Sequence, residues 1–190
     1  MTTATTRKID RAMNEEDWQT ARRLILRELN AAPDDHWLTT RLATTFYEQR
    51  DYAAALEWSE KAMCLAPECP LVVWDYACAL DLTGQEEAAI QVWRDLIDRG
   101  PQRIAADECG EGLRWAESLV NDSRYRAALS FFDLGKKKEA LRLLRAHLAH
   151  RKPGLPSLYS LREARAKERQ MLGSKETSIP RPHLAEGRAS

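Results

Sequence analysis

The sequence predicts an all-α fold built from stacked helix–turn–helix repeats. The same spacing separates Pro33, Pro67 and Pro101 along the chain. It also separates Ala21, Ala55 and Ala89. Within the units, apolar residues recur at three- and four-residue steps, the period of an amphipathic helix. A repeat period of about 34 residues is typical of helical arrays, in which each unit covers the apolar face of its neighbour.

The units follow one another with one interruption. Residues 1–13 are Thr-rich and lack an apolar pattern, so we expect a flexible N-terminus. Residues 14–33 supply one good helix and therefore a half-repeat. The complete repeats are expected at 36–69, 70–103 and 121–154. An insertion over 104–120 separates the last two. A capping helix over 156–172 should cover the exposed end, and 173–190 should be a disordered tail because it has almost no apolar content.

The clearest repeat resembles the tetratricopeptide repeat. It carries the characteristic residues of that family at Leu42, Ala43, Phe46, Ala55, Ala62 and Pro67. The family's first-helix tryptophan is replaced by Thr39 and its second-helix aromatic by Ser59. The resemblance implies a right-handed α-solenoid of about three and a half repeats with a C-terminal capping helix. It also implies that the first helix of each pair lines a concave groove.

The insertion over 104–120 leaves the next repeat intact. Gly135 follows Gly84 by one repeat period plus the length of the insertion, and Ala140 follows Ala89 by the same step. We expect a loop over roughly 100–111 and then an overlong helix that ends near Leu134, because apolar residues continue at helical spacing.

The acidic residues of this loop are Asp107, Glu108 and Glu111, and they lack the regular ligand spacing of a calcium loop. We therefore expect a solvated acidic loop.

Composition indicates a globular chain without membrane attachment. The 190 residues carry a formal net charge of zero, but the charge is unevenly divided. Residues 1–120 hold 13 Lys and Arg against 22 Asp and Glu, and residues 121–190 hold 16 against 7. No apolar run approaches the length of a membrane span, and the N-terminus lacks the apolar centre of a signal peptide. We expect a cytoplasmic protein whose four cysteines are free thiols.

Motifs for catalysis, cofactors or metals are not recognisable. The sequence contains no phosphate-binding glycine loop and no hydrolase or metalloprotease motif. His147 and His150 lie three residues apart but lack further ligands at a suitable spacing, and Cys64 and Cys69 do not form a zinc pair. We expect no enzyme activity, no cofactor and no metal site.

The candidate functional surface is the concave groove that the family resemblance implies. The resemblance places seven apolar, aromatic or thiol side chains there: Trp37, Tyr47, Trp74, Cys78, Leu82, Tyr125 and Phe132. Family members that clamp a peptide carboxylate use Lys, Arg and Asn at positions that here hold Thr40, Thr44, Trp74 and Cys78. The clamp is therefore absent, and an aromatic groove is expected instead.

Exposed aromatic residues commonly mark interaction sites. The leading hypothesis is a non-enzymatic scaffold or adaptor that binds a peptide or helix with apolar side chains. One alternative is a small bacterial secretion-type chaperone that holds a substrate segment. Another is nucleic-acid binding through the basic C-terminal half, which is disfavoured because Tyr159 alone interleaves with the bases. A competing interpretation is that the overlong helix, the cap or a second copy of the chain, as in a homo-oligomer, fills the groove.

Overall fold

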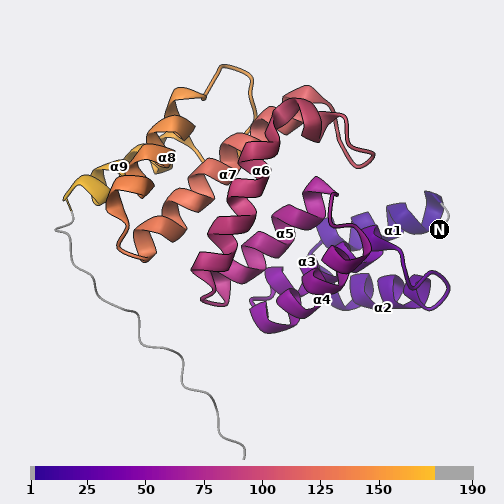
Figure 1. Ribbon diagram of the computed structural model, residues 1–190. Helices are drawn as coiled ribbons and strands as arrows, with labels where there is room; N and C mark the ends of the chain where they lie inside the picture. The colour runs from indigo at the N-terminus through magenta and orange to yellow at the C-terminus, as the bar shows by residue number, and fades with distance from the viewer. Residues whose placement is uncertain (1–2, 174–190) are drawn as a thin grey trace, which may run out of the picture.

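The computed structural model describes residues 3–173 and is all-α over that range, which confirms the predicted α-solenoid (Figure 1). The helices are α1 (Thr3–Asn14), α2 (Trp18–Leu29), α3 (His36–Glu48), α4 (Tyr52–Leu65), α5 (Pro70–Leu82), α6 (Glu86–Ala105), α7 (Leu113–Asp133), α8 (Lys137–Ala149) and α9 (Leu161–Gly173). They form four helix pairs and a final single helix. Figure 1 shows the pairs stacked in chain order, from α1 and α2 at one end to α8 and α9 at the other.

The two helices of each pair are joined by the same kind of turn. A residue shortly after the first helix has a positive φ in every pair: Glu16 (57°), Arg50 (62°), Gly84 (79°) and Gly135 (73°). The amide of the next residue then donates to a carbonyl near the end of that helix, as in the bonds from Asp17 to Ala12 (2.8 Å), Asp51 to Phe46 (3.0 Å), Gln85 to Leu80 (2.9 Å) and Lys136 to Phe131 (2.9 Å). This is the Schellman arrangement, which satisfies carbonyls at the end of a helix.

The N-terminal segment is part of the array. The expectation of flexibility over 1–13 is wrong for the described residues of that segment, because α1 forms the first helix of a complete pair. Ile9 and Ala12 are buried, and Ile9 packs in one cluster with Ile25, Leu38 and Leu42. Ile9 and Ala12 precede Ala43 and Phe46 by one repeat period, so the few apolar residues of α1 occupy the same register as those of α3.

Small residues make the close helix contacts of the core. Ala55 and Ala89 are 1% and 0% exposed, as the repeat period predicts. Trp93, on α6, is fully buried and meets Trp74 of α5 edge to face at 4.9 Å. Close approach at the alanines leaves room for these large rings between neighbouring pairs.

The insertion extends two helices and leaves a short loop. α6 continues to Ala105 across a kink at Gly100, whose φ of 74° and ψ of 162° are not helical, and Pro101 follows directly. A proline at this point removes a backbone donor, which is why the kink lies there. The connecting loop spans 106–112, and α7 then runs for 21 residues.

The C-terminal capping helix begins later than the predicted start at residue 156. α9 begins at Leu161, and residues 155–160 before it form a non-helical strap that bends at Leu158 and Tyr159. Ala164 and Met171 of α9 are fully buried, and α9 packs on α8. The tail predicted over 173–190 lies outside the described residues from 174 onward. Between residues 3 and 173, no helix has both the length and the apolar character needed to cross a bilayer.

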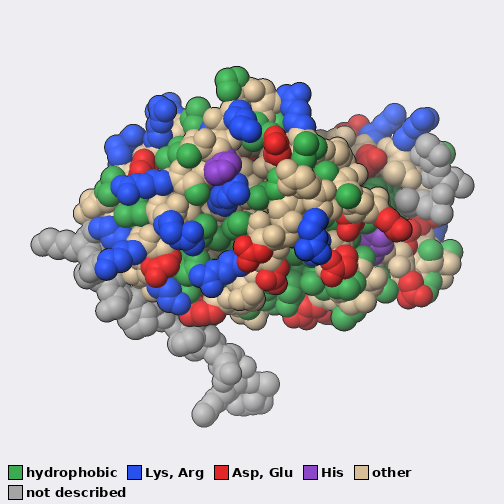
Figure 2. Space-filling view, turned by 45° about the horizontal axis from the view of Figure 1, so that its top comes forward, with side chains coloured by type: hydrophobic (Ala, Val, Ile, Leu, Met, Phe, Trp, Pro, Cys, Tyr) green, Lys and Arg blue, Asp and Glu red, His purple; other side chains and the backbone are tan. Residues whose placement is uncertain are grey.

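Charge is distributed along the array as the sequence implies. Figure 2 shows Lys and Arg side chains gathered over the C-terminal end of the molecule, where α8 and α9 lie. Part of this charge is neutralised locally, since Arg145 pairs with Glu168 at 3.0 Å.

Candidate functional site

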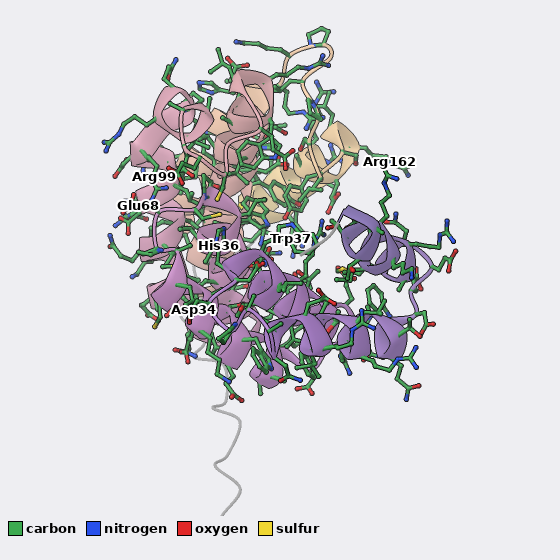
Figure 3. The ribbon with its side chains drawn as sticks, turned by 90° about the vertical axis from the view of Figure 1, so that its right-hand side faces the viewer. Asp34, His36, Trp37, Glu68, Arg99 and Arg162 are labelled. Atoms are coloured by element: carbon green, nitrogen blue, oxygen red, sulfur yellow. The ribbon has the colours of Figure 1, made fainter. Side chains whose placement is uncertain are left out.

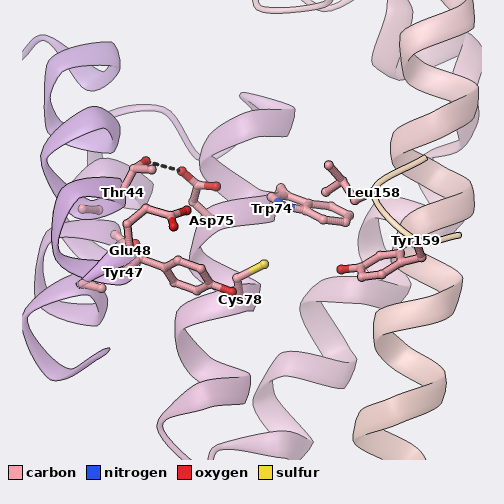
Figure 4. Close-up of a pocket in the computed structure, with 11 residues that line it drawn as sticks. Thr44, Tyr47, Glu48, Trp74, Asp75, Cys78, Leu158 and Tyr159 are labelled. Carbon is pink, nitrogen blue, oxygen red and sulfur yellow. Dashed lines mark hydrogen bonds between the residues drawn. The ribbon is translucent and has the colours of Figure 1, made fainter. Parts of the chain in front are cut away.

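A cavity of about 180 Å³ opens between α3, α5 and the strap (Figure 4). It is lined by Ala43, Thr44, Tyr47, Glu48, Ala55, Ser59, Trp74, Asp75, Cys78, Leu158 and Tyr159. The residues from α3 and α5 recur at three- and four-residue steps, so each of these helices presents one face to the cavity. The small side chains of Ala43, Ala55 and Ser59 leave the space that the larger ones surround.

The strap forms the third wall and is held by α7. Asp122 accepts hydrogen bonds from Ser157 Oγ (2.5 Å) and from the Leu158 amide (2.8 Å). Ser118 Oγ donates to the Pro156 carbonyl at 2.5 Å. These bonds fix the backbone of the strap, while the Leu158 side chain remains 73% exposed at the rim of the cavity.

The strap also covers the groove at the third complete repeat. The Tyr159 ring stacks on Tyr125 with centroids 4.1 Å apart and an interplanar angle of 22°. Tyr125 is 0% exposed, and its hydroxyl lies 3.5 Å from Glu163 Oε1 of α9. The C-terminal segment of the chain therefore fills the part of the groove where Tyr125 was expected to meet a partner.

Two carboxylates give the cavity an acidic side. Thr44 Oγ1 donates to Asp75 Oδ2 at 3.3 Å, and Glu48 lies one turn further along α3. Burial raises the pKa of Asp75 from 3.8 to about 7, against the opposing effects of the Thr44 hydrogen bond and the charge of Arg41, while Glu48 raises it further. Arg41 lies 3.4 Å from Asp10, with which it forms an ion pair. Asp75 therefore lacks a close cationic partner among the described residues.

The thiol and the phenol beside these carboxylates stay neutral at physiological pH. Burial raises the pKa of Cys78 to about 12, so its thiol is protonated. Burial also raises the pKa of Tyr47 to about 12. The cavity thus combines an apolar aromatic wall with one buried carboxylate whose ionisation depends on what enters.

The structure brings together three of the seven predicted groove residues. Tyr47, Trp74 and Cys78 line the cavity, although Trp74 is only 8% exposed and its ring also packs into the core.

The other four predicted residues lie elsewhere. Trp37 packs beside the N-terminal cluster with the Arg41 guanidinium 5.1 Å from its ring. Leu82 is exposed at the end of α5, and Phe132 packs partly buried against the central core. The expectation that Tyr125 lines an open groove is wrong, because this side chain is fully buried beneath Tyr159 of the strap.

Sequence reasoning missed Asp75, Leu158 and Tyr159. A signal for Asp75 exists, since it is the single charged residue in the apolar stretch from Pro70 to Leu80. Leu158 and Tyr159 fall within the capping helix predicted over 156–172, whereas the structure places both residues in the strap before α9.

Comparison with known proteins supports the fold. No model of a known protein family matches the sequence, and no curated protein matches it. Two solved structures, both described as crystal structures of MamA, resemble this one. The first has a TM-score of 0.62 at 17% identity and covers 90% of this chain and 85% of the other. The second has a TM-score of 0.59 at 18% identity and covers 86% of this chain and 92% of the other. These matches support a tetratricopeptide-like fold.

Proposed function

We propose that the protein is a non-enzymatic interaction scaffold that binds a segment of another protein in the cavity between α3, α5 and the strap. The observation that carries the proposal is a cavity with aromatic walls and a carboxylate, Asp75, that has no close cationic partner among residues 3–173. A tetratricopeptide-like fold supports it, because such arrays present the first helices of their pairs as an extended concave surface.

The chemistry of the cavity favours a Lys or Arg flanked by aliphatic side chains. Trp74, Tyr47 and Leu158 offer apolar surface to the aliphatic groups and to the stem of a basic side chain. The charged end would lie against Asp75, with Glu48 exposed beside it. A buried carboxylate that gains a charge-assisted hydrogen bond is stabilised in its ionised form.

This contact makes binding depend on pH in a defined direction. In the free protein the pKa of Asp75 is about 7, and a bound cation lowers it. The affinity therefore rises as the pH rises through the free-state pKa and reaches a plateau above it. Each unit by which the pKa falls on binding corresponds to about 1.4 kcal/mol.

A peptide-display selection tests the proposal. The full chain and its Glu48→Gln/Asp75→Asn double variant are immobilised separately and panned with the same random library at pH 8. We expect the wild type to enrich peptides with a Lys or Arg between aliphatic residues, and the double variant to lose that enrichment. The variant keeps the shape of the cavity because both changes are nearly isosteric.

Two results would overturn the proposal. One is enrichment of the same peptides by both proteins, which would place binding away from the carboxylates. The other is tight, salt-sensitive binding of an oligonucleotide with no peptide enriched, which would favour the basic C-terminal end instead.

A further inference from the structure

Three metal-ligating side chains from distant parts of the chain meet at one end of the array. They are His36 at the start of α3, Cys69 immediately before α5, and Cys109 in the 106–112 loop. One ring nitrogen of His36 and the two Sγ atoms all lie within 4.8 Å of one another. The distance from Cys109 Sγ to His36 Nε2 is 3.4 Å. Figure 3 shows His36 with sulfur atoms beside it.

These separations match a tetrahedral zinc site. With Zn–S bonds of about 2.3 Å and Zn–N bonds of about 2.0–2.1 Å, tetrahedral angles place ligand atoms roughly 3.5–3.8 Å apart. The sulfur–nitrogen distance already has this value within about 0.2 Å. Small side-chain rotations bring the remaining pairs into range, since every pair starts within 4.8 Å.

Cys69 occupies a position that helix capping does not explain. Asp35 stands one repeat period earlier, before α3, and its carboxylate accepts the Leu38 amide at 3.0 Å. At the equivalent place before α5, Cys69 makes no side-chain cap bond. The Cys69 side chain is 5% exposed and lies beside His36 and Cys109.

The loop that carries Cys109 is held in a fixed shape. Asp107 Oδ1 accepts the Cys109 amide at 2.9 Å, and the Gly110 amide donates to the Asp107 carbonyl at 2.9 Å. A Cβ at Gly110 would come within 2.6 Å of the Ile104 carbonyl oxygen, so only glycine permits this turn.

The backbone before Cys69 is held in the same way. Arg99 donates to the Glu68 carbonyl at 2.5 Å, and its guanidinium lies 3.3 Å from the Glu68 carboxylate. Both thiols are thus presented by constrained backbone, which reduces the conformational cost of binding a metal.

We propose that His36, Cys69 and Cys109 form a binding site for Zn²⁺, with a water molecule as the fourth ligand. Two thiolates and one imidazole are the ligand types that Zn²⁺ prefers, whereas Mg²⁺ and Ca²⁺ require oxygen ligands. The bound ion joins the inserted loop to the first helices of the two preceding repeats. The expectation that the chain has no metal site rested on local spacing, whereas these ligands come from three separate segments of the sequence.

Metal binding must displace protons from the thiols. Burial and a hydrogen bond with Cys69 raise the pKa of the Cys109 thiol to about 12 in the metal-free protein. Each thiol that becomes a thiolate ligand releases one proton to solvent, and no electron is transferred.

Cobalt and zinc titrations of the reduced, full-length protein test the site. Addition of Co²⁺ should produce thiolate-to-cobalt charge-transfer absorption that saturates at one ion per chain. Zn²⁺ should displace the cobalt and raise the melting temperature. Cys69→Ser is an informative variant because serine is a preferred N-cap residue, so the metal-free protein should be at least as stable as the wild type. Cys69→Ser and Cys109→Ser should each weaken zinc binding by ~100-fold or more, since loss of even an outer partner of a ligand costs about 10–100-fold.

Cys64→Ser provides the matched control, because Cys64 is an exposed thiol at the end of α4. It should bind cobalt and zinc as the wild type does. The proposal is overturned if the reduced wild type shows no charge-transfer band. It is equally overturned if Cys69→Ser and Cys109→Ser bind as tightly as Cys64→Ser. If the reduced wild type binds neither ion but air oxidation joins Cys69 to Cys109, the cluster is a disulfide pair and the zinc proposal is wrong.

Discussion

Asp75→Asn should change how the stability of the protein depends on pH. The pKa of Asp75 is raised to about 7 in the folded protein, mainly by burial, from an ordinary value of 3.8. The folded state therefore holds this proton more tightly than the unfolded chain does. Between pH 4 and 7 the unfolded chain binds fewer protons at this position, so the wild type loses stability as the pH rises through that window. Asparagine carries no ionisable proton, and the variant lacks this loss.

The magnitude follows from the size of the pKa change. A rise from 3.8 to about 7 corresponds to at most roughly 4 kcal/mol, at about 1.4 kcal/mol for each pH unit. Because Asp75 is only partly buried, as its exposed surface shows, solvent screening reduces the effect to about 1–2 kcal/mol. The free energy of unfolding of Asp75→Asn minus that of the wild type should increase by this amount between pH 5 and pH 8.

Urea denaturation at several pH values measures the difference directly. Both proteins are unfolded at pH 5, 6, 7 and 8, and the difference in free energy is plotted against pH. Burial also raises the pKa values of Asp81 and Asp122, but both groups are present in the two proteins and cancel in the difference. A difference that stays constant within about 0.5 kcal/mol, or falls with pH, would refute the argument that Asp75 is destabilised by burial.

Three further changes test the packing, the turns and the strap. Ala89→Leu should destabilise the array by about 1–3 kcal/mol because it overpacks a fully buried helix contact, whereas Leu at the exposed neighbour Ala88 should change the melting temperature little. Arg50 and Gly84 both have positive φ, so Arg50→Gly should stabilise the protein by about 0.5–1 kcal/mol and Gly84→Ala should destabilise it by about 1–2 kcal/mol. Urea denaturation measures both changes, and equal effects would contradict the turn assignment. Tyr159→Ala should lower the free energy of unfolding by about 2 kcal/mol because it removes a stacked ring, and Tyr159→Phe should retain most of the stability.

The repeat period predicted those parts of the fold that depend on residue patterns within each helix pair. Ala55 and Ala89 are buried where the repeat period places them, and the turn at Gly84 has the conformation that glycine favours. The first helix was missed because a Thr-rich segment with only Ile9 and Ala12 on its buried face gives a weak periodic signal. Packing against the next two helices supplies the stability that this local pattern lacks.

The candidate sites depend on contacts between distant segments and were harder to predict. Family resemblance indicated the face of Tyr47 and Trp74, but the cavity that Asp75 lines is formed by residues of several helices together with the strap. The capping helix predicted over 156–172 includes most of the strap, because Leu158, Leu161 and Ala164 lie at helical spacing. The non-helical conformation of the strap is fixed by Asp122, which lies 35 and 36 residues before its donors, and no local pattern encodes such a contact.

A double-mutant cycle between protein and peptide measures the central contact of the proposed function. The tightest Lys-containing peptide from the display selection is compared with its Lys→Met analogue, and each is titrated calorimetrically at pH 8 into the wild type and into Asp75→Asn. Direct contact between the lysine and Asp75 predicts a coupling free energy of about 1 kcal/mol or more, with the wild type and the Lys peptide forming the tightest pair. If the two losses of affinity simply add, to within about 0.3 kcal/mol, the lysine does not bind at Asp75 and the cavity is not the recognition site proposed for this protein.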